Sequence, residues 1–546
     1  MPEHAADITV VHDGLSPLAH TLNGTFLGLH SAKYSQDYFL GIPYALPPLG
    51  SLRFMPPAAL NLTWAGMKRA TEFGPQCIGY FDYEMDTPRS MNEDCLTLNI
   101  FRPHSNDPLS KLPVVIYIYG GAYIHGGSND QRYNLTWIVA QSVAIGKPII
   151  GVTLNFRSSV FGFMSSRQIL EEGNTNIGLR DQRLAFQWIQ ENVESFGGDR
   201  TRVTIWGASS GAGNVGIHLT AYGGRDDHLF RAAIMSSGSP VTSSLGRHTI
   251  SAQNAFEKLI RLAGCGNATD AFRCLQGLPI EELSAILTNS QDFGFSYVMA
   301  LARPVLDNDL IRDLGSVQLE TGRFLKIPIM NTITSNEGGG YTPEGLNTRE
   351  DVKQFLGDWF DILPPSVTER LMALYLTRSS TETGEEDLGH FFMEASYILG
   401  DIEFVAPHRL TCDAFSHFQP TFCGRWDAIP YGADPRRGTT HAADLAPIFH
   451  NIPCTGFVIC PFQGKPEAYS RLADLISTMI ISFITELNPN SAIPTSWNVS
   501  TWENHKPGLS LDFVFSDYEP SRIETEAFRV DETEYIRSIL APVLVR

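Results

Sequence analysis

The sequence predicts an α/β fold with an open, mostly parallel sheet, and three observations support this prediction. Residues 112–119 (LPVVIYIY) and 201–206 (TRVTIW) are rich in β-branched and aromatic residues, as buried strands are. A helical pattern at 179–196 lies between them. Hydrophobic residues make up 43% of the 546 residues, enough for a large core. Strands that alternate with helices indicate a parallel sheet.

The chain is predicted to form a single domain over residues 1–546, because no low-complexity linker, internal repeat or block of like charge divides it. The longest apolar stretch near the end, residues 472–487 (LADLISTMIISFITEL), contains Asp474 and is too short to span a bilayer. It is predicted to be a core helix, so no transmembrane segment is expected.

The net charge of the chain makes some classes of binding partner unlikely. The net charge is −19 and no cluster of lysine and arginine is visible, which argues against nucleic acid and anionic membranes. An acidic surface suits a protein that handles neutral or cationic small molecules. The sequence leaves the oligomeric state open.

The segment GASSG at 207–211 matches the G-x-S-x-G elbow, in which a strand-to-helix turn exposes a serine nucleophile. Only Ser209 has a glycine two residues away on both sides, so it is preferred over Ser210. A tight turn or a close helix contact would also explain the small residues. The strand pattern before the serine and the helix-compatible residues after it favour the elbow.

A second glycine-rich segment follows the strand at 112–119. Gly120 and Gly121 could simply end that strand, or their loop could point backbone N–H groups at a developing oxyanion. The N–H of Ser210, the residue after the nucleophile, would supply another donor.

A nucleophilic serine needs a base, and the base needs an orienting acid. His441, in GTTHAADLAPIF, is the preferred base, and His125 and His450 are its rivals. Glu337 follows a predicted strand and precedes three glycines. A carboxylate there commonly faces water, but the order Ser209, Glu337, His441 is that of α/β-hydrolases.

The eight cysteines fall in close sequential pairs and contain no C-x-x-C motif, which favours disulfides over metal binding. Disulfides imply an oxidising compartment. The opening residues 1–11 (MPEHAADITVV) do not form a signal peptide. We expect a secreted protein whose signal has been removed, in preference to an intracellular one. Potential N-glycosylation sites are Asn23, Asn61, Asn134, Asn267 and Asn498.

Seven segments together resemble the type-B carboxylesterase/lipase family, which includes cholinesterases and fungal lipases. The resemblance covers roughly residues 20–515, and its order and spacing are specific. The segments are FLGIPYALPPLGSLRF (39–54), NEDCLTLNIFRP (92–103), YIYGGAYIHGG (117–127), residues 176–213, RPVLDNDLI (303–311), SNEGGGY (335–341) and HAADLAPIF (441–449).

This resemblance implies an α/β-hydrolase fold with a sheet of about eleven strands. It implies Ser209 as nucleophile, His441 as base and acid, and Glu337 as the orienting carboxylate. The oxyanion donors it implies are the N–H groups of Gly121, Ala122 and Ser210. It also implies the disulfides Cys77–Cys95 and Cys265–Cys274. The structural ion pairs that it implies are Arg53–Glu93 and Arg157–Asp181. The pairings Cys412–Cys423 and Cys454–Cys460 are predicted only from proximity in the sequence.

Three positions depart from the family pattern. Ala208 stands where the family usually has glutamate, Ser210 where it has alanine, and Ala122 where it has a third glycine. The loop between Cys77 and Cys95 contains no tryptophan. We therefore expect poor binding of quaternary ammonium groups. Within the loop, Tyr80, Phe81 or Tyr83 could partly replace the missing tryptophan ring, and Asp82 or Glu84 could partly replace the missing glutamate charge. The rim of the site is predicted to include Tyr80, Phe81, Tyr83 and Met91.

The sequence therefore predicts a secreted serine ester hydrolase that acts on neutral small-molecule or lipid esters through an acyl-enzyme, with no metal or organic cofactor. Two alternatives use the same fold: an acyl transferase or natural-product-processing enzyme with the same triad, and a non-catalytic adhesion protein.

Overall fold

The computed structural model describes residues 16–81, 90–105, 111–242, 250–360, 363–377, 388–509, 511–525 and 528–546. Tyr83, expected at the rim of the site, and Asp82 and Glu84, named as possible replacements for the missing charge, lie outside the described residues.

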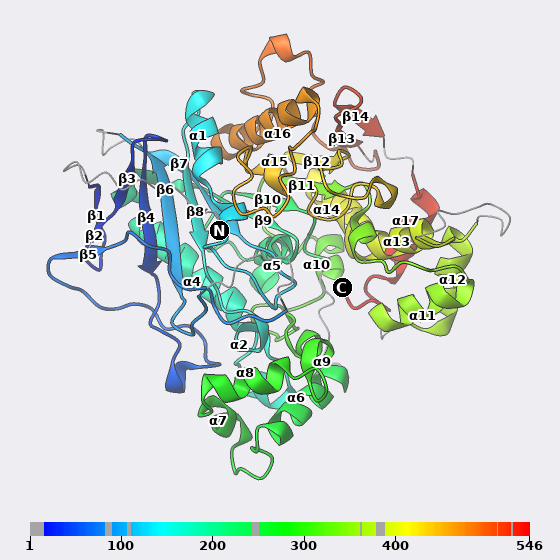
Figure 1. Cartoon of the computed structure of the whole chain (residues 1–546), viewed down its shortest axis with the longest axis horizontal. Coiled ribbons are helices and arrows are strands. Elements are labelled where there is room, and N and C mark those ends of the chain that lie inside the picture. Colours follow the sequence, from blue (N-terminus) through cyan, green and yellow to red (C-terminus); the bar gives the residue numbers. More distant parts are fainter. Residues whose placement is uncertain are drawn as a thin grey trace.

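An eleven-stranded sheet crosses the molecule, as predicted (Figure 1). Its seven strands from β13 to β8 run parallel, and the strands at both edges are antiparallel. In spatial order the strands are β14 (Arg522–Thr525), β13 (Leu511–Phe515), β12 (Thr421–Trp426), β11 (Ile329–Thr334), β10 (Ala232–Ser236), β9 (Gly198–Ala208), β7 (Leu112–Ile118), β8 (Ile150–Leu154), β6 (Thr97–Pro103), β4 (Gln36–Pro43) and β3 (Leu29–Ser31). A separate small sheet contains β1 (Leu18–His20), β2 (Thr25–Leu27) and β5 (Met67–Arg69).

Helices cover both faces of the sheet, which is why the central strands are apolar throughout. In β7 the side chains of Val114, Val115 and Ile116 are all inaccessible to solvent, although they alternate between the two faces. One face packs against α1 (Thr136–Ala144) and α16 (Glu467–Glu486), which contact each other. The other face packs against α4 (Ile177–Asn192), α5 (Ser210–Gly224) and α14 (Ala406–Ser416), and α10 (Gly315–Glu320) packs on α5 and α14.

The predicted core helix near the end of the chain is α16, in which fourteen of the twenty residues are buried. Among the helices of the described residues, none has the length and apolar character needed to cross a membrane.

Two further groups of helices lie outside these layers (Figure 1). The first, at the bottom of the view, contains α2 (Ser159–Phe163), α6 (Ile250–Leu262), α7 (Ala271–Gln276), α8 (Ile280–Thr288) and α9 (Gly294–Leu301). The second, at the right, contains α11 (Arg349–Trp359), α12 (Pro365–Tyr375), α13 (Phe392–Gly400) and α17 (Val530–Ile539). The short helices α3 (Arg167–Glu171) and α15 (Leu445–Ile448) complete the set.

All eight cysteines are paired, and each bridge joins neighbours in the sequence. The pairs are Cys77–Cys95, Cys265–Cys274, Cys412–Cys423 and Cys454–Cys460. Both ion pairs named from the sequence are present. Arg53 Nε lies 2.6 Å from Glu93 Oε1, and Arg157 Nη2 lies 2.7 Å from Asp181 Oδ1 in the core.

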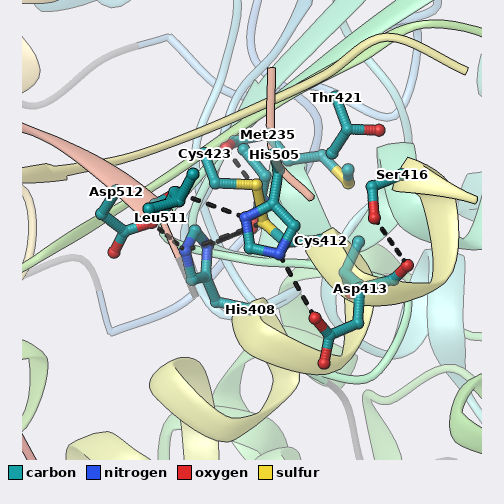
Figure 2. The surroundings of a disulfide bond; sticks show 12 residues. Met235, His408, Cys412, Asp413, Ser416, Thr421, Cys423, His505, Leu511 and Asp512 are labelled. Atoms are coloured by element: carbon teal, nitrogen blue, oxygen red, sulfur yellow. Dashed lines mark hydrogen bonds and ion pairs between the residues drawn. A yellow bond between two sulfur atoms is a disulfide. The ribbon is translucent and has the colours of Figure 1, made fainter. Parts of the chain in front are cut away.

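The bridge between Cys412 and Cys423 ties α14 to β12 and is surrounded by buried polar side chains (Figure 2). The ring of His408 lies against the Cys412 sulfur and places Nε2 3.2 Å from Asp512 Oδ1. Beside it, His505 Nε2 lies 3.2 Å from Asp413 Oδ1. Burial lowers the pKa of His505, but the hydrogen bonds to Asp413 and to the Leu511 carbonyl and the negative charges of Asp413 and Asp512 together outweigh burial, so the pKa is raised overall.

Candidate active site

The candidate site lies where β7, β9 and β11 end, because parallel strands bring their carboxyl ends to one edge of the sheet. Ser209 follows β9, and Glu337 lies three residues beyond β11. Asn336 forms an isolated parallel bridge with Thr440, which places His441 beside Glu337 although 104 residues separate them. The strand order thus gathers residues that are far apart in the chain.

Ser209 occupies a strained turn between β9 and α5. Its backbone angles are φ 57° and ψ −131°, which few residues other than glycine adopt. The flanking glycines allow this turn to form. A Cβ at Gly207 would lie 2.3 Å from the carbonyl oxygen of Gly211, and a Cβ at Gly211 would lie 2.2 Å from that of Ile118. The geometry is the sharp strand-to-helix turn that an elbow requires, with Ser209 at its tip and Ser210 already the first residue of α5.

Glu337 is a buried carboxylate whose two oxygens have separate partners. Its Oε2 lies 2.5 Å from Nδ1 of His441. Its Oε1 accepts hydrogen bonds from the hydroxyl of Ser237 at 2.7 Å and from the backbone N–H of Thr334 at 2.8 Å. The carboxylate is therefore fixed, and it holds the His441 ring with Nδ1 turned toward it.

The two rival histidines have other contacts. His450 Nε2 lies 2.8 Å from Asp474 Oδ1 of α16. His125 donates its backbone N–H to the carbonyl of Gly121, and its ring lies beside that glycine. Of the three histidines, His441 is the one that lies against the buried Glu337.

The glycine-rich loop lies directly against the serine. A Cβ at Gly120 would come within 2.9 Å of Ser209 Cβ and 3.5 Å of Ser209 Oγ. Gly121, Ala122 and Tyr123 then have φ values of 109°, 52° and 68°. Alanine thus adopts the left-handed conformation here, at a cost of about 1–2 kcal/mol relative to an ordinary backbone. Its N–H group is retained.

Aromatic rings surround the imidazole of His441. The ring centroid of Phe404 lies 4.8 Å from that of His441, and that of Tyr341 lies 5.5 Å away. Phe404 belongs to a π-helical turn at Asp401–Val405, and such turns often occur at functional sites. Sequence reasoning missed Phe404, since nothing in the sequence near it marks a contact with His441.

Asp444 is a second buried acid beside the pair, and sequence reasoning missed it too. Burial, and to a smaller extent the negative charge of Glu337, together raise its pKa to about 7 against a smaller opposing effect of His441. An aspartate inside the apolar run AADLAPIF was the available signal.

The segment within the first disulfide contacts the outer helices. The Tyr80 hydroxyl lies 2.9 Å from Ser284 Oγ of α8, and burial raises the pKa of Tyr80 to about 12. Phe81 meets Phe295 of α9 edge to face, with ring centroids 5.5 Å apart. Met91, also expected at the rim, is exposed.

The five candidate glycosylation sites differ in their surroundings. Asn61, Asn267 and Asn498 are exposed. The Asn23 side-chain amide donates to the carbonyls of Leu60 and Leu62, and that of Asn134 donates to Gln131.

Comparison with known proteins identifies the family. A sequence model described as "Carboxylesterase family" matches residues 16–523. The chain belongs to the carboxylesterase family. It is 32% identical to "Lipase 2" of Geotrichum candidum, over 89% of each chain, and 30% identical to "Secreted lipase 1" of Botryotinia fuckeliana, over 95% of this chain and 91% of the relative. The crystal structure of Aspergillus niger EstA matches with a TM-score of 0.83 and 26% identity, over 97% of this chain and 99% of that one.

Several sequence predictions are thereby confirmed. The fold is that of an α/β-hydrolase carboxylesterase, and the chain is a carboxylic ester hydrolase. Its secretion is supported by relatives whose names mark them as secreted and by the four disulfides.

Proposed function

We propose that this carboxylesterase family member is a single domain, residues 1–546, that hydrolyses neutral esters through a triad of Ser209, His441 and Glu337. The observation that carries the proposal is the short contact between Glu337 and His441 at the strand ends where Ser209 occupies its strained turn. Each residue type then has the role that acyl transfer requires.

In the first half of the reaction, His441 takes the proton of Ser209 Oγ as this oxygen attacks the ester carbonyl. Positive charge develops on the imidazole, and the buried Glu337 carboxylate stabilises it. His441 then gives the proton to the leaving alcohol. Water, activated by the same imidazole, hydrolyses the acyl-enzyme in the second half.

Backbone N–H groups of Gly121, Ala122 and Ser210 would stabilise the oxyanion. Support comes from the close approach of the loop to Ser209 and from the start of α5 at Ser210, where backbone N–H groups lack partners within the helix. No metal or organic cofactor has a role in this mechanism.

Neutral acyl esters, including lipid esters, are the proposed substrates. Apolar rings line the imidazole, and Ala208 provides no charge beside the nucleophile. The names of the similar fungal proteins describe lipases, one of them a "Secreted triacylglycerol lipase" of Gibberella zeae. We further propose N-glycosylation at Asn61, Asn267 and Asn498, whose side chains are exposed, ahead of Asn23 and Asn134, whose amides are hydrogen-bonded.

Labelling and turnover of two serine variants test the triad. Ser209→Ala should lose ester hydrolysis by about 10⁴-fold or more, because the covalent step disappears. Ser210→Ala is the matched control, since it keeps the backbone N–H and should retain most activity. A fluorophosphonate probe should modify Ser209 in the wild type. Labelling at Ser210, or an active Ser209→Ala variant, would refute the assignment.

Product analysis separates the alternatives. With water and a primary alcohol both present, an ester hydrolase releases mainly free acid, whereas an acyl transferase releases mainly the new ester. A folded chain that turns over no ester in a broad acyl-length panel and resists the fluorophosphonate would support the non-catalytic alternative.

A further inference from the structure

Far from the candidate active site, two histidines and an aspartate converge at one edge of the large sheet. Asp37 lies on β4, between the edge strand β3 and β6. The register pairs Asp37 with His30 of β3 and with Arg102 of β6. Directly paired residues of antiparallel strands point to the same face, and His104, two residues beyond Arg102, returns to that face. The strand register therefore brings four side chains together.

The three potential ligand atoms are already close to one another. His30 Nδ1 and His104 Nδ1 each lie 2.9 Å from the same oxygen, Asp37 Oδ1. The other oxygen, Oδ2, accepts from Arg102 Nε at 3.2 Å and Nη2 at 3.1 Å. Arg102 also donates to the carbonyl of Phe196, so it is held in place and orients the carboxylate.

We propose that His30, His104 and Asp37 form a binding site for one divalent transition-metal cation, such as Zn²⁺. Imidazole and carboxylate are established ligands for such ions. With metal–ligand distances near 2.0–2.1 Å, an N···O separation of 2.9 Å corresponds to an N–metal–O angle of about 90°. This angle suits three ligands on one face of an ion, with water at the other positions.

The site needs little rearrangement to bind an ion. Both Nδ1 atoms already lie at hydrogen-bonding distance from Oδ1, which keeps all three atoms close together. A coordinating Nδ1 carries no proton, so on binding the cation takes the place of the proton between each Nδ1 and Oδ1, and that proton leaves to Nε2 or to solvent. The side chains of His30 and His104 are 14% and 28% exposed, whereas that of Asp37 is 1% exposed, so the ion has a route from solvent to a buried carboxylate.

The other comparable cluster in the described part of the chain lacks this capacity. His408 lies near Cys412 and Cys423, but the two sulfurs form a disulfide and offer no thiolate. The His30 cluster also has a structural consequence, because an ion there would join β3, β4 and the end of β6 and so secure the edge of the sheet.

Zinc titration of the purified, chelator-treated chain by calorimetry tests the proposal. We expect one saturable site per chain, and zinc-edge absorption should show nitrogen and oxygen ligands that include two imidazoles. His30→Gln and His104→Gln should each weaken binding about 10- to 100-fold, and the double variant should abolish it. Zinc should also raise the melting temperature of the wild type, and Mg²⁺ should not.

His228→Gln is the matched control, because His228 also contacts an aspartate, Asp226, but is 88% exposed and belongs to no group of three potential ligands among the described residues. It should bind zinc as the wild type does, and ester turnover should show that every variant is folded. The absence of saturable binding would show a hydrogen-bonded cluster only and would overturn the proposal. Wild-type affinity in the folded double variant would overturn it too.

Discussion

Replacing Asp444 by asparagine should make the protein more stable at alkaline pH than the wild type. The native chain holds the Asp444 proton up to about pH 7, because the carboxyl group is buried and faces Glu337, whereas an unfolded chain releases it near pH 3.9. Between these values the native state binds more protons, so its stability falls as pH rises. Above pH 7 the raised pKa of Asp444 lowers the free energy of unfolding by about 4 kcal/mol in full, at 1.36 kcal/mol for each pKa unit.

Asparagine copies the neutral form and removes this dependence on pH. With an unfolding entropy of about 2.1 cal/mol/K per residue over 546 residues, 4 kcal/mol corresponds to about 3–4 °C in melting temperature. The wild type already bears part of the cost at pH 5, so the advantage of Asp444→Asn should grow by about 2 °C between pH 5 and pH 8. Below pH 4 this contribution of Asp444 vanishes.

Calorimetric melting of both proteins across this pH range measures the effect, and the difference between them cancels every other titrating group. Asp94→Asn is the control, because it makes the same substitution at an exposed aspartate. If the curves for Asp444→Asn and the wild type stay parallel from pH 5 to pH 8, Asp444 is ionised in the native protein and the reasoning fails.

Three further predictions concern catalysis. Gly120→Ala should lower kcat about 100-fold, because its Cβ would displace Ser209. Gly357→Ala is the control, since a Cβ there meets open space and should have little effect. Equal rates for the two variants in an ester assay would contradict the placement of the glycine-rich loop against Ser209. Ser237→Ala should lower kcat/KM about tenfold or more through kcat, because it removes a hydrogen bond to the charged Glu337; an unchanged kcat would show that the bond is dispensable. Neutral p-nitrophenyl esters should give a higher kcat/KM than acylthiocholines of the same acyl length, and a tenfold preference for the thiocholines would refute the interpretation of Ala208.

The sequence allowed prediction of those parts of the molecule that depend on local patterns. The strands β7 and β9 follow from their apolar runs, and the turn at Ser209 follows from glycines two residues away on each side. Local patterns do not show which distant side chains complete a site. Ser237 and Phe404 reach Glu337 and His441 only because the sheet order and a π-helical turn bring them there.

The same limit applies to the edge cluster. His30 and Asp37 are seven residues apart and His104 is another 67 residues along, a spacing that matches no metal-binding motif. Only the antiparallel register of three strands aligns them. Residue types were visible in the sequence, but their convergence depends on strand pairing.

Ala122 shows how distant contacts also decide whether a departure from a family pattern is tolerated. Alanine at φ 52° is strained, and the next residue, Tyr123, is left-handed as well. Two anchors from other parts of the chain secure the loop: the N–H of Ser159 donates to the Tyr123 carbonyl at 2.7 Å, and that of Tyr80 donates to the Ile124 carbonyl at 2.9 Å. These contacts offset the strain, so the N–H of Ala122 stays available for the proposed oxyanion hole although the third glycine is missing.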